Sequence, residues 1–314
     1  MMTKYRQNLP QMGEKTFITD GGLETVMLFH QQIALPEFAA YDLLRTQQGI
    51  QLLDQYYKRY VALARQYEKG IVLETPTWRA SQEWGNKIGD SPTVIKQFNI
   101  QAVALLEQIR DLLETEQSPI VVSGCIGPKG DGYTPAKTMS PEQAYAYHCE
   151  QIETFADTSV DMIGALTLNY IDEAIGISKA AQQYELPVCI SFTVETDGRL
   201  PSGDTLETAI DAVDEATQNG PTYYMINCAH PTHFSHLFTS DSNCLLRVKG
   251  LRGNASCLSH AKLDESDELD EGNPEQFGRE LSKLRTSSPH ITVLGGCCGT
   301  DHRHIEEICR YLSS

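Results

Sequence analysis

Three cysteines follow short apolar stretches of the chain. Cys228 lies near the end of the run 223–231 (Tyr-Tyr-Met-Ile-Asn-Cys-Ala-His-Pro), and Cys297 and Cys298 are adjacent in 293–300 (Val-Leu-Gly-Gly-Cys-Cys-Gly-Thr). If both stretches are strands that end at one mouth, the three thiolates meet there. Three thiolates leave one position open on tetrahedral zinc, and an open position is typical of a catalytic rather than a structural site. The sequence therefore predicts that Cys228, Cys297 and Cys298 bind zinc and act in catalysis.

An open zinc position suits the activation of a further thiol. A free thiol has a pKa near ~8.5, so only a few per cent of it is the nucleophilic thiolate near neutral pH. Zinc deprotonates a thiol that coordinates it, and it has no redox chemistry of its own. The predicted site therefore fits a simple displacement in which a bound thiolate is the nucleophile.

Strand-length apolar runs alternate with segments of helical periodicity, which together define the expected fold. The predicted strands are 16–19, 71–74, 120–123, 162–168, 187–192, 223–227, 245–248 and 291–294. The predicted helices are 43–67, 92–114, 141–158, 171–184, 205–218, 274–284 and 301–311. Ser91-Pro92 and Ser140-Pro141 are typical helix starts. This alternation predicts a single-domain (β/α)8 barrel over residues 1–314, with a doubly wound open sheet as the alternative.

The active site of such a barrel lies at the carboxyl ends of its strands. Several polar residues and glycines occupy the predicted ends, and we predict that six of them contact substrate. They are Asp20, Gly21, Gly22, Glu74, Thr167 and Asn227. The long polar segment 249–273 is predicted to be a surface excursion near the rim of the site.

Composition excludes several classes of partner. The net charge is −17 and no Lys/Arg cluster is present, which argues against nucleic acid. No apolar run approaches eighteen residues, and the first ten residues lack the apolar centre of a signal peptide, so we expect a cytosolic protein without a membrane span. The acidic run within 264–275 is predicted to be a solvated loop. The expected partners are small-molecule substrates, and a homo-oligomer stays open.

Nine cysteines in such a chain are expected to be mostly reduced. Six of them are not assigned to zinc, and we expect most of these to be small buried groups. They are Cys125, Cys149, Cys189, Cys244, Cys257 and Cys309.

Five motifs resemble those of the homocysteine S-methyltransferase family, in family order and across nearly the whole chain. They are Thr-Asp-Gly-Gly-Leu-Glu-Thr (19–25), Ser-Gly-Cys-Ile-Gly-Pro (123–128), Ile-Asn-Cys-Ala-His-Pro (226–231), Asn-Ala (254–255) and Gly-Gly-Cys-Cys-Gly-Thr (295–300). The resemblance implies a zinc-containing barrel that methylates the sulfur of homocysteine to give methionine.

One position departs from the family pattern. Members usually have Glu-Thr at the end of the fourth strand, where the glutamate helps to hold the amino acid substrate, but this chain has Leu166-Thr167. Nearby carboxylates of Asp20, Glu24 and Glu74 are predicted to compensate; alternatively, the substrate is another thiol or a selenol. A milder departure is Cys125, where the family usually has Ser.

The methyl donor is expected to carry its methyl group on a cationic centre, as S-methylmethionine, S-adenosylmethionine and betaine do. Trp78, Trp84, Tyr133 and Tyr170 are candidates for cation recognition, with ordinary packing as the alternative for each. A methylfolate route with cobalamin is not expected, because such members carry further domains. Two other readings stay open: a non-catalytic zinc-binding barrel, and a hydrolase with Cys228 or Cys297 as nucleophile.

Overall fold

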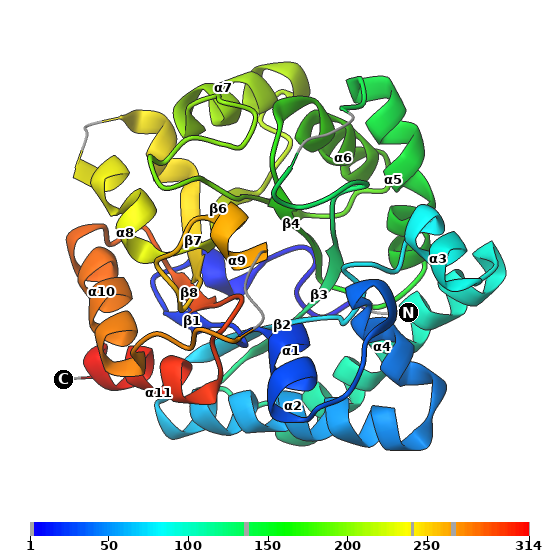
Figure 1. Ribbon diagram of the computed structural model, residues 1–314, viewed down its shortest axis with the longest axis horizontal. Helices are drawn as coiled ribbons and strands as arrows, with labels where there is room; N and C mark the ends of the chain where they lie inside the picture. The colour runs from blue at the N-terminus through cyan, green and yellow to red at the C-terminus, as the bar shows by residue number, and fades with distance from the viewer. Residues whose placement is uncertain (1–2, 135–137, 240–241, 265–267, 314) are drawn as a thin grey trace.

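Eight parallel strands close into a barrel in the order of the sequence, and helices form a ring around it, as Figure 1 shows. This computed structural model describes residues 3–134, 138–239, 242–264 and 268–313. The barrel closes where β1 pairs with β8, with Phe17 opposite Val293 and Ile18 opposite Leu294. The predicted (β/α)8 barrel is therefore confirmed, and the open-sheet alternative is wrong.

The strands are buried over almost their whole length, which explains why they read as apolar runs. They are β1 Phe17–Ile18, β2 Gly70–Glu74, β3 Ile120–Ile126, β4 Met162–Leu168, β5 Val188–Phe192, β6 Tyr223–Ala229, β7 Val248–Gly253 and β8 Val293–Gly296. Apolar side chains from several strands fill the amino-terminal half of the barrel, so access to its interior comes from the carboxyl ends.

The helices largely follow the predicted segments. The α-helices are α1 Leu23–Thr25, α2 Gln47–Gln66, α3 Gln82–Ile88, α4 Pro92–Leu113, α5 Pro141–Ala156, α6 Ile171–Gln183, α7 Leu206–Thr217, α8 Pro231–Phe234, α9 His260–Asp264, α10 Pro274–Ser287 and α11 His302–Tyr311. Short 3-10 helices cover Pro10–Met12, Pro36–Phe38, Ala40–Arg45, Ser235–Thr239 and Asn243–Arg247, and a π-helix covers Val26–His30.

Helix caps explain where several of these helices begin. Ser91 and Ser140 accept hydrogen bonds from the amides of Val94 and Gln143, as expected of N-caps. The predicted helix 43–67 is divided, because Thr46 is extended and caps α2 after the preceding 3-10 helix ends.

The seventh strand is where the prediction was wrong. Residues 243–247 form a 3-10 helix, and β7 begins at Val248 and runs to Gly253. The run Val-Lys-Gly-Leu-Arg-Gly resembles a loop because it contains two glycines and two cations instead of a continuous apolar stretch. The first part of the predicted surface excursion is therefore inside the sheet, and Arg252 is a barrel residue.

The rest of that segment does lie at the rim. Ser256, Leu263, Leu269 and Asp270 all line the cavity described below. Within the acidic run, Glu265 and Asp267 fall outside the described residues. Glu268, Asp270 and Glu275 are exposed, the last of them in α10, whereas Glu271 is half-buried and pairs with His30 and Arg303. The prediction of a solvated loop is therefore confirmed only in part.

The remaining cysteines and one histidine differ in burial. Burial is expected for most of the six cysteines not assigned to zinc: Cys125, Cys189 and Cys309 are buried, Cys149 and Cys244 are half-buried, and Cys257 is exposed. His304, in the first turn of α11, is fully buried, and its ring packs against Phe277. Among the described residues, no helix is both long and apolar enough to cross a membrane.

Candidate active site

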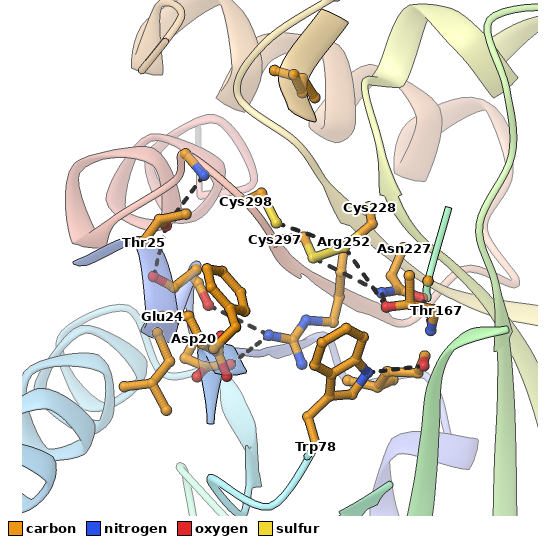
Figure 2. A pocket seen from close by; sticks show the side chains of 18 of the residues that line it. Asp20, Glu24, Thr25, Trp78, Thr167, Asn227, Cys228, Arg252, Cys297 and Cys298 are labelled. Atoms are coloured by element: carbon orange, nitrogen blue, oxygen red, sulfur yellow. Dashed lines mark hydrogen bonds and ion pairs between the residues drawn. A yellow bond between two sulfur atoms is a disulfide. The ribbon is translucent and has the colours of Figure 1, made fainter. Parts of the chain in front are cut away.

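The three predicted metal ligands converge at the carboxyl ends of β6 and β8, as Figure 2 shows. The Sγ atoms of Cys228, Cys297 and Cys298 all lie within 4.8 Å of one another. Cys228 Sγ and Cys298 Sγ are 3.9 Å apart. Two sulfurs bound to one tetrahedral zinc at about 2.3 Å are themselves about 3.8 Å apart. The separation of this pair therefore fits zinc, and the cluster offers three of four ligands.

A disulfide joins Cys228 to Cys297, whereas Cys298 is free. This pairing differs from the predicted reduced state. The two Cα atoms are 5.4 Å apart, within the range that a disulfide spans. Both sulfurs can bind a metal as thiolates only after a two-electron reduction of this bond.

Unusual backbone conformations position two residues of this cluster. Cys228 has φ +55° and Thr167 has φ +64°, a region that side chains other than glycine rarely adopt. The pairing of β4 and that of β6 both shift register at these points. Such irregularities redirect side chains, and they concentrate near functional sites.

Polar side chains surround the three sulfurs. Asn227 Nδ2 donates to Thr167 Oγ1 at 2.7 Å and lies 3.8 Å from Cys297 Sγ. Thr167 Oγ1 is 3.7 Å from Cys228 Sγ, and Tyr133 Oη is 3.6 Å from Cys298 Sγ. Asn227 Oδ1 in turn accepts from the amide of Thr167 and from Ser191 Oγ. Thr167 and Asn227 thus hold each other and the cysteine side chains in place.

Burial raises the pKa of the Cys298 thiol to about 11, although the hydrogen bond from Tyr133 opposes the shift. Without a bound cation this group is therefore a neutral thiol at neutral pH. Since a coordinating metal deprotonates thiols, the burial and the donor set together suit a metal ligand.

A cavity of about 410 Å³ opens beside the cysteines. It is lined by all nine residues that the sequence predicted for catalysis, metal binding or substrate contact. They are Asp20, Gly21, Gly22, Glu74, Thr167, Asn227, Cys228, Cys297 and Cys298. Gly22 packs so closely that a Cβ there would lie 2.6 Å from the carbonyl oxygen of Cys297. The end of β1 is therefore held directly against the metal-ligand loop.

A buried ion pair occupies the cavity and was not predicted. Arg252 Nη2 lies 2.7 Å from Asp20 Oδ1, and both residues are buried. Tyr56 donates to the second oxygen of Asp20 at 3.1 Å. Burial alone would lower the pKa of Arg252, but Asp20 and Glu74 raise it above its ordinary value, so the guanidinium is charged. Asp20 is therefore already paired with a cation, which argues against its role as an ammonium anchor.

Two glutamates remain to face a ligand. Burial raises the pKa of Glu74 to about 7, and the pKa of Glu24, which also lines the cavity, is raised to about 7 by the same cause. Glu74 Oε2 has no hydrogen-bond partner among the described residues. Glu74 extends from β2 to the β4 wall, where a Cβ on Gly164 would lie 2.7 Å from Oε2. Its carboxyl group thus lies against Gly164, which precedes Leu166 by two residues in β4. Leu166 is the position at which the family usually has its glutamate.

The four candidate aromatic residues divide into two pairs. Trp78 and Tyr133 line the cavity, whereas Trp84 and Tyr170 are not among its lining residues. Arg79 and Lys87 lie over the ring of Trp84, at 3.4 Å and 3.6 Å from its centroid. Tyr170 Oη accepts a hydrogen bond from the amide of Met139. Of the four, only Trp78 and Tyr133 therefore line the cavity; Arg79 lies 4.3 Å from the ring centroid of Trp78, and the ring of Tyr133 stacks on that of His260.

The sequence model of the homocysteine S-methyltransferase family matches residues 17–312 of this chain. The chain belongs to the homocysteine S-methyltransferase family. It is accordingly a methyltransferase. The cysteine cluster and the cavity beside it form its candidate active site.

Solved structures support the fold. The chain is similar to the metallated form of the homocysteine methyltransferase MmuM from Escherichia coli, with 16% identity and a TM-score of 0.73 over 97% of this chain and 98% of that one. It is similar to the oxidized form of the same enzyme, with 18% identity and a TM-score of 0.71 over 97% of this chain and 99% of that one. At these identities, the likeness shows a shared barrel and does not transfer individual contacts.

Arg252 is the functional candidate that the sequence analysis missed. It lies in β7, a strand misplaced by several residues, and a single arginine between glycines carried no recognisable pattern. Its position could have indicated a role, because Arg252 lies one residue before the carboxyl end of β7, where barrel enzymes place polar side chains.

Proposed function

We propose that this enzyme transfers a methyl group from a cationic donor to the thiol of homocysteine, with zinc bound by Cys228, Cys297 and Cys298. The observation that carries the proposal is the convergence of three Sγ atoms within 4.8 Å beside a cavity large enough for small substrates. Membership of the family supports the reaction class.

The three cysteines would hold the ion once the bond between Cys228 and Cys297 is reduced. Bound zinc would supply a fourth coordination position that stabilises the acceptor sulfur as a thiolate. Thr167, Asn227 and Tyr133 contribute hydrogen-bond donors to the cysteine sulfurs, which fixes their orientation and moderates their negative charge.

Glu74 is the residue that we assign to the ammonium group of homocysteine. Glu74 lines the cavity, and its Oε2 atom is unpaired and lies beside β4, close to the position left apolar by Leu166. Asp20 acts instead as a positioning residue, because its carboxylate holds Arg252. Gly21 and Gly22 let the end of β1 approach the loop that carries the metal ligands.

The donor enters as a sulfonium or a quaternary ammonium. As the acceptor sulfur forms its bond to the methyl carbon, the bond from that carbon to the donor breaks and its electron pair neutralises the donor. The acceptor's thiol proton leaves to solvent. Trp78, Tyr133 and Glu24 all line the cavity, and two aromatic rings and a carboxyl group suit a cation. These features do not choose among S-methylmethionine, S-adenosylmethionine and betaine.

The first test is calorimetric titration of the reduced, zinc-loaded protein with L-homocysteine in two buffers of different ionisation enthalpy. Release of about one proton would show that a thiolate enters the open position. The same protein is then assayed with each class of donor. Absence of methyl transfer to any thiol would refute the proposed function.

A second candidate is a barrel of the same kind that acts on another thiol or selenol, or that binds zinc without catalysis. The observation that favours it is Leu166, an apolar side chain in place of the family's glutamate. Binding of homocysteine in the titration would argue against the first of these alternatives, a barrel that acts on a different thiol or selenol. The described residues give no support to a cysteine hydrolase, since His260, which lies next to Cys228, contacts its carbonyl oxygen rather than a sulfur.

A further inference from the structure

We infer that Arg252 binds the carboxylate of the acceptor, so that this enzyme selects thiols that carry a carboxylate group. The inference rests on the proposed function and names the class of acceptor that the site takes. Homocysteine belongs to this class, and so do short mercapto acids without an amino group.

The guanidinium is held in one orientation by two of its three nitrogens. Nη2 donates to Asp20 Oδ1 at 2.7 Å, and Nε donates to the carbonyl oxygen of Gly296 at 3.1 Å. The third nitrogen, Nη1, is buried and has no hydrogen-bond partner in the described part of the chain. Figure 2 shows the group among the residues that line the cavity.

An unpaired donor on a buried charge is costly, and a ligand that accepts from it recovers that cost. Arg252 is only 5% exposed, so bulk water reaches it poorly. A carboxylate is the natural acceptor, because hydrogen bonds between charged groups are stronger than neutral ones. The two fixed nitrogens mean that little conformational freedom is lost when Nη1 binds.

The position of the guanidinium matches a short acceptor. Gly296, whose carbonyl oxygen binds Arg252 Nε, directly precedes the metal-ligand candidate Cys297. A small molecule can therefore place its sulfur at the cysteine cluster and its carboxylate at Arg252.

Other charges in the cavity support this assignment. Arg79 is the other cation among the described lining residues, and its guanidinium is placed over the rings of Trp78 and Trp84. Near the cysteines, Arg252 is thus the group that can offset an incoming negative charge. Glu74 and Glu24, with pKa values raised to about 7, repel that charge less than ordinary carboxylates do.

The test compares two ligands of similar size and with the same thiol, one with a carboxylate and one with a neutral amide: 4-mercaptobutyrate and 4-mercaptobutyramide. Their dissociation constants are measured by calorimetry on the reduced, zinc-loaded protein. The parent should bind the acid at least about tenfold more tightly, as expected for a hydrogen bond to a charged group. In Arg252→Gln the ratio of the amide's dissociation constant to that of the acid should fall to about one. Both ligands carry the same thiol, so its contribution to binding cancels in this ratio.

Arg110 supplies a matched control. It also forms a buried ion pair, with Nη1 2.8 Å from Asp161 Oδ2, but it does not line the cavity. Arg110→Gln should therefore leave the acid-to-amide ratio at the parent value, whatever it does to stability. If Arg252→Gln fails to fold, Arg252→Lys keeps the charge and loses the planar donor group, and its ratio should fall several-fold.

Two results would overturn the inference while leaving the proposed function intact. One is equal binding of acid and amide by the parent, and the other is an unchanged ratio in the foldable Arg252 variant. The inference is also overturned if homocysteine binds but neither mercapto ligand does. If homocysteine does not bind to the zinc-loaded protein, the proposed function itself is refuted and the inference falls with it.

Discussion

Replacement of Glu74 by Gln should change how stability depends on pH. Glu74 is 6% exposed, and burial raises its pKa from an ordinary value of 4.5 to about 7. The unfolded chain therefore ionises this group at a lower pH than the folded chain does. A carboxyl whose folded pKa is raised favours the folded state below pH 4.5, and that contribution is lost as pH rises through 7.

The magnitude follows from the size of the shift. One pKa unit corresponds to about 1.4 kcal/mol, so the full effect is about 3 kcal/mol. Between pH 5 and pH 8, the two-state titration formula gives a loss of about 2.5 kcal/mol. Relative to its parent, Glu74→Gln should gain about this amount in unfolding free energy over the same interval, because glutamine does not ionise.

Urea denaturation of the reduced proteins at several pH values measures this difference directly. Zinc binding is itself dependent on pH, but parent and variant share the same cysteines, so this contribution cancels in the comparison. Glu116→Gln, at an exposed glutamate, is the matched control and should show the parent's pH dependence. If Glu74→Gln also keeps the parent's pH dependence, the carboxyl does not titrate as its burial implies.

The remaining predictions concern metal and ligand binding. Serine in place of Cys228, Cys297 or Cys298 should each lower the zinc retained after dialysis and abolish methyl transfer; full zinc occupancy in all three variants would show that the ligands are wrong. Leu166→Glu should tighten homocysteine binding by about tenfold through a charged hydrogen bond to the ammonium but should not tighten 4-mercaptobutyrate; no gain, or a loss, would point to a different acceptor. Trp78→Ala should raise the KM of the cationic donor by about fivefold, as one cation–π contact of about 1 kcal/mol predicts, while the KM of the thiol changes little; equal changes in both would indicate a packing role.

The barrel and the cysteine cluster were both accessible from the sequence. Strands buried on both faces must be apolar, and the helices between them keep a helical period, so the alternation predicts a (β/α)8 fold. Once that fold is assumed, residues at the carboxyl ends of strands must share one mouth. This is why Cys228, Cys297 and Cys298 could be grouped across a separation of 69 residues, and why Glu74 could be placed with them.

The partners of the buried charges depended on the tertiary structure. Asp20 and Arg252 are 232 residues apart, and their ion pair forms because the barrel places the ends of β1, β7 and β8 side by side. No local pattern encodes such a contact, and the glycine-rich strand that carries Arg252 resembles a loop. The pairing also changes what Asp20 does, from a predicted substrate contact to a support for the guanidinium.

Local sequence thus determined which residues reach the mouth of this barrel, because strand and helix periodicity follow from the backbone itself. Only the folded barrel decided how those residues share their charges and hydrogen bonds. Those assignments depend on distances and burial between segments that are remote in the chain. The raised pKa of Glu74 and the unpaired nitrogen of Arg252 both arise at this level, and they distinguish this site from a generic cluster of three cysteines.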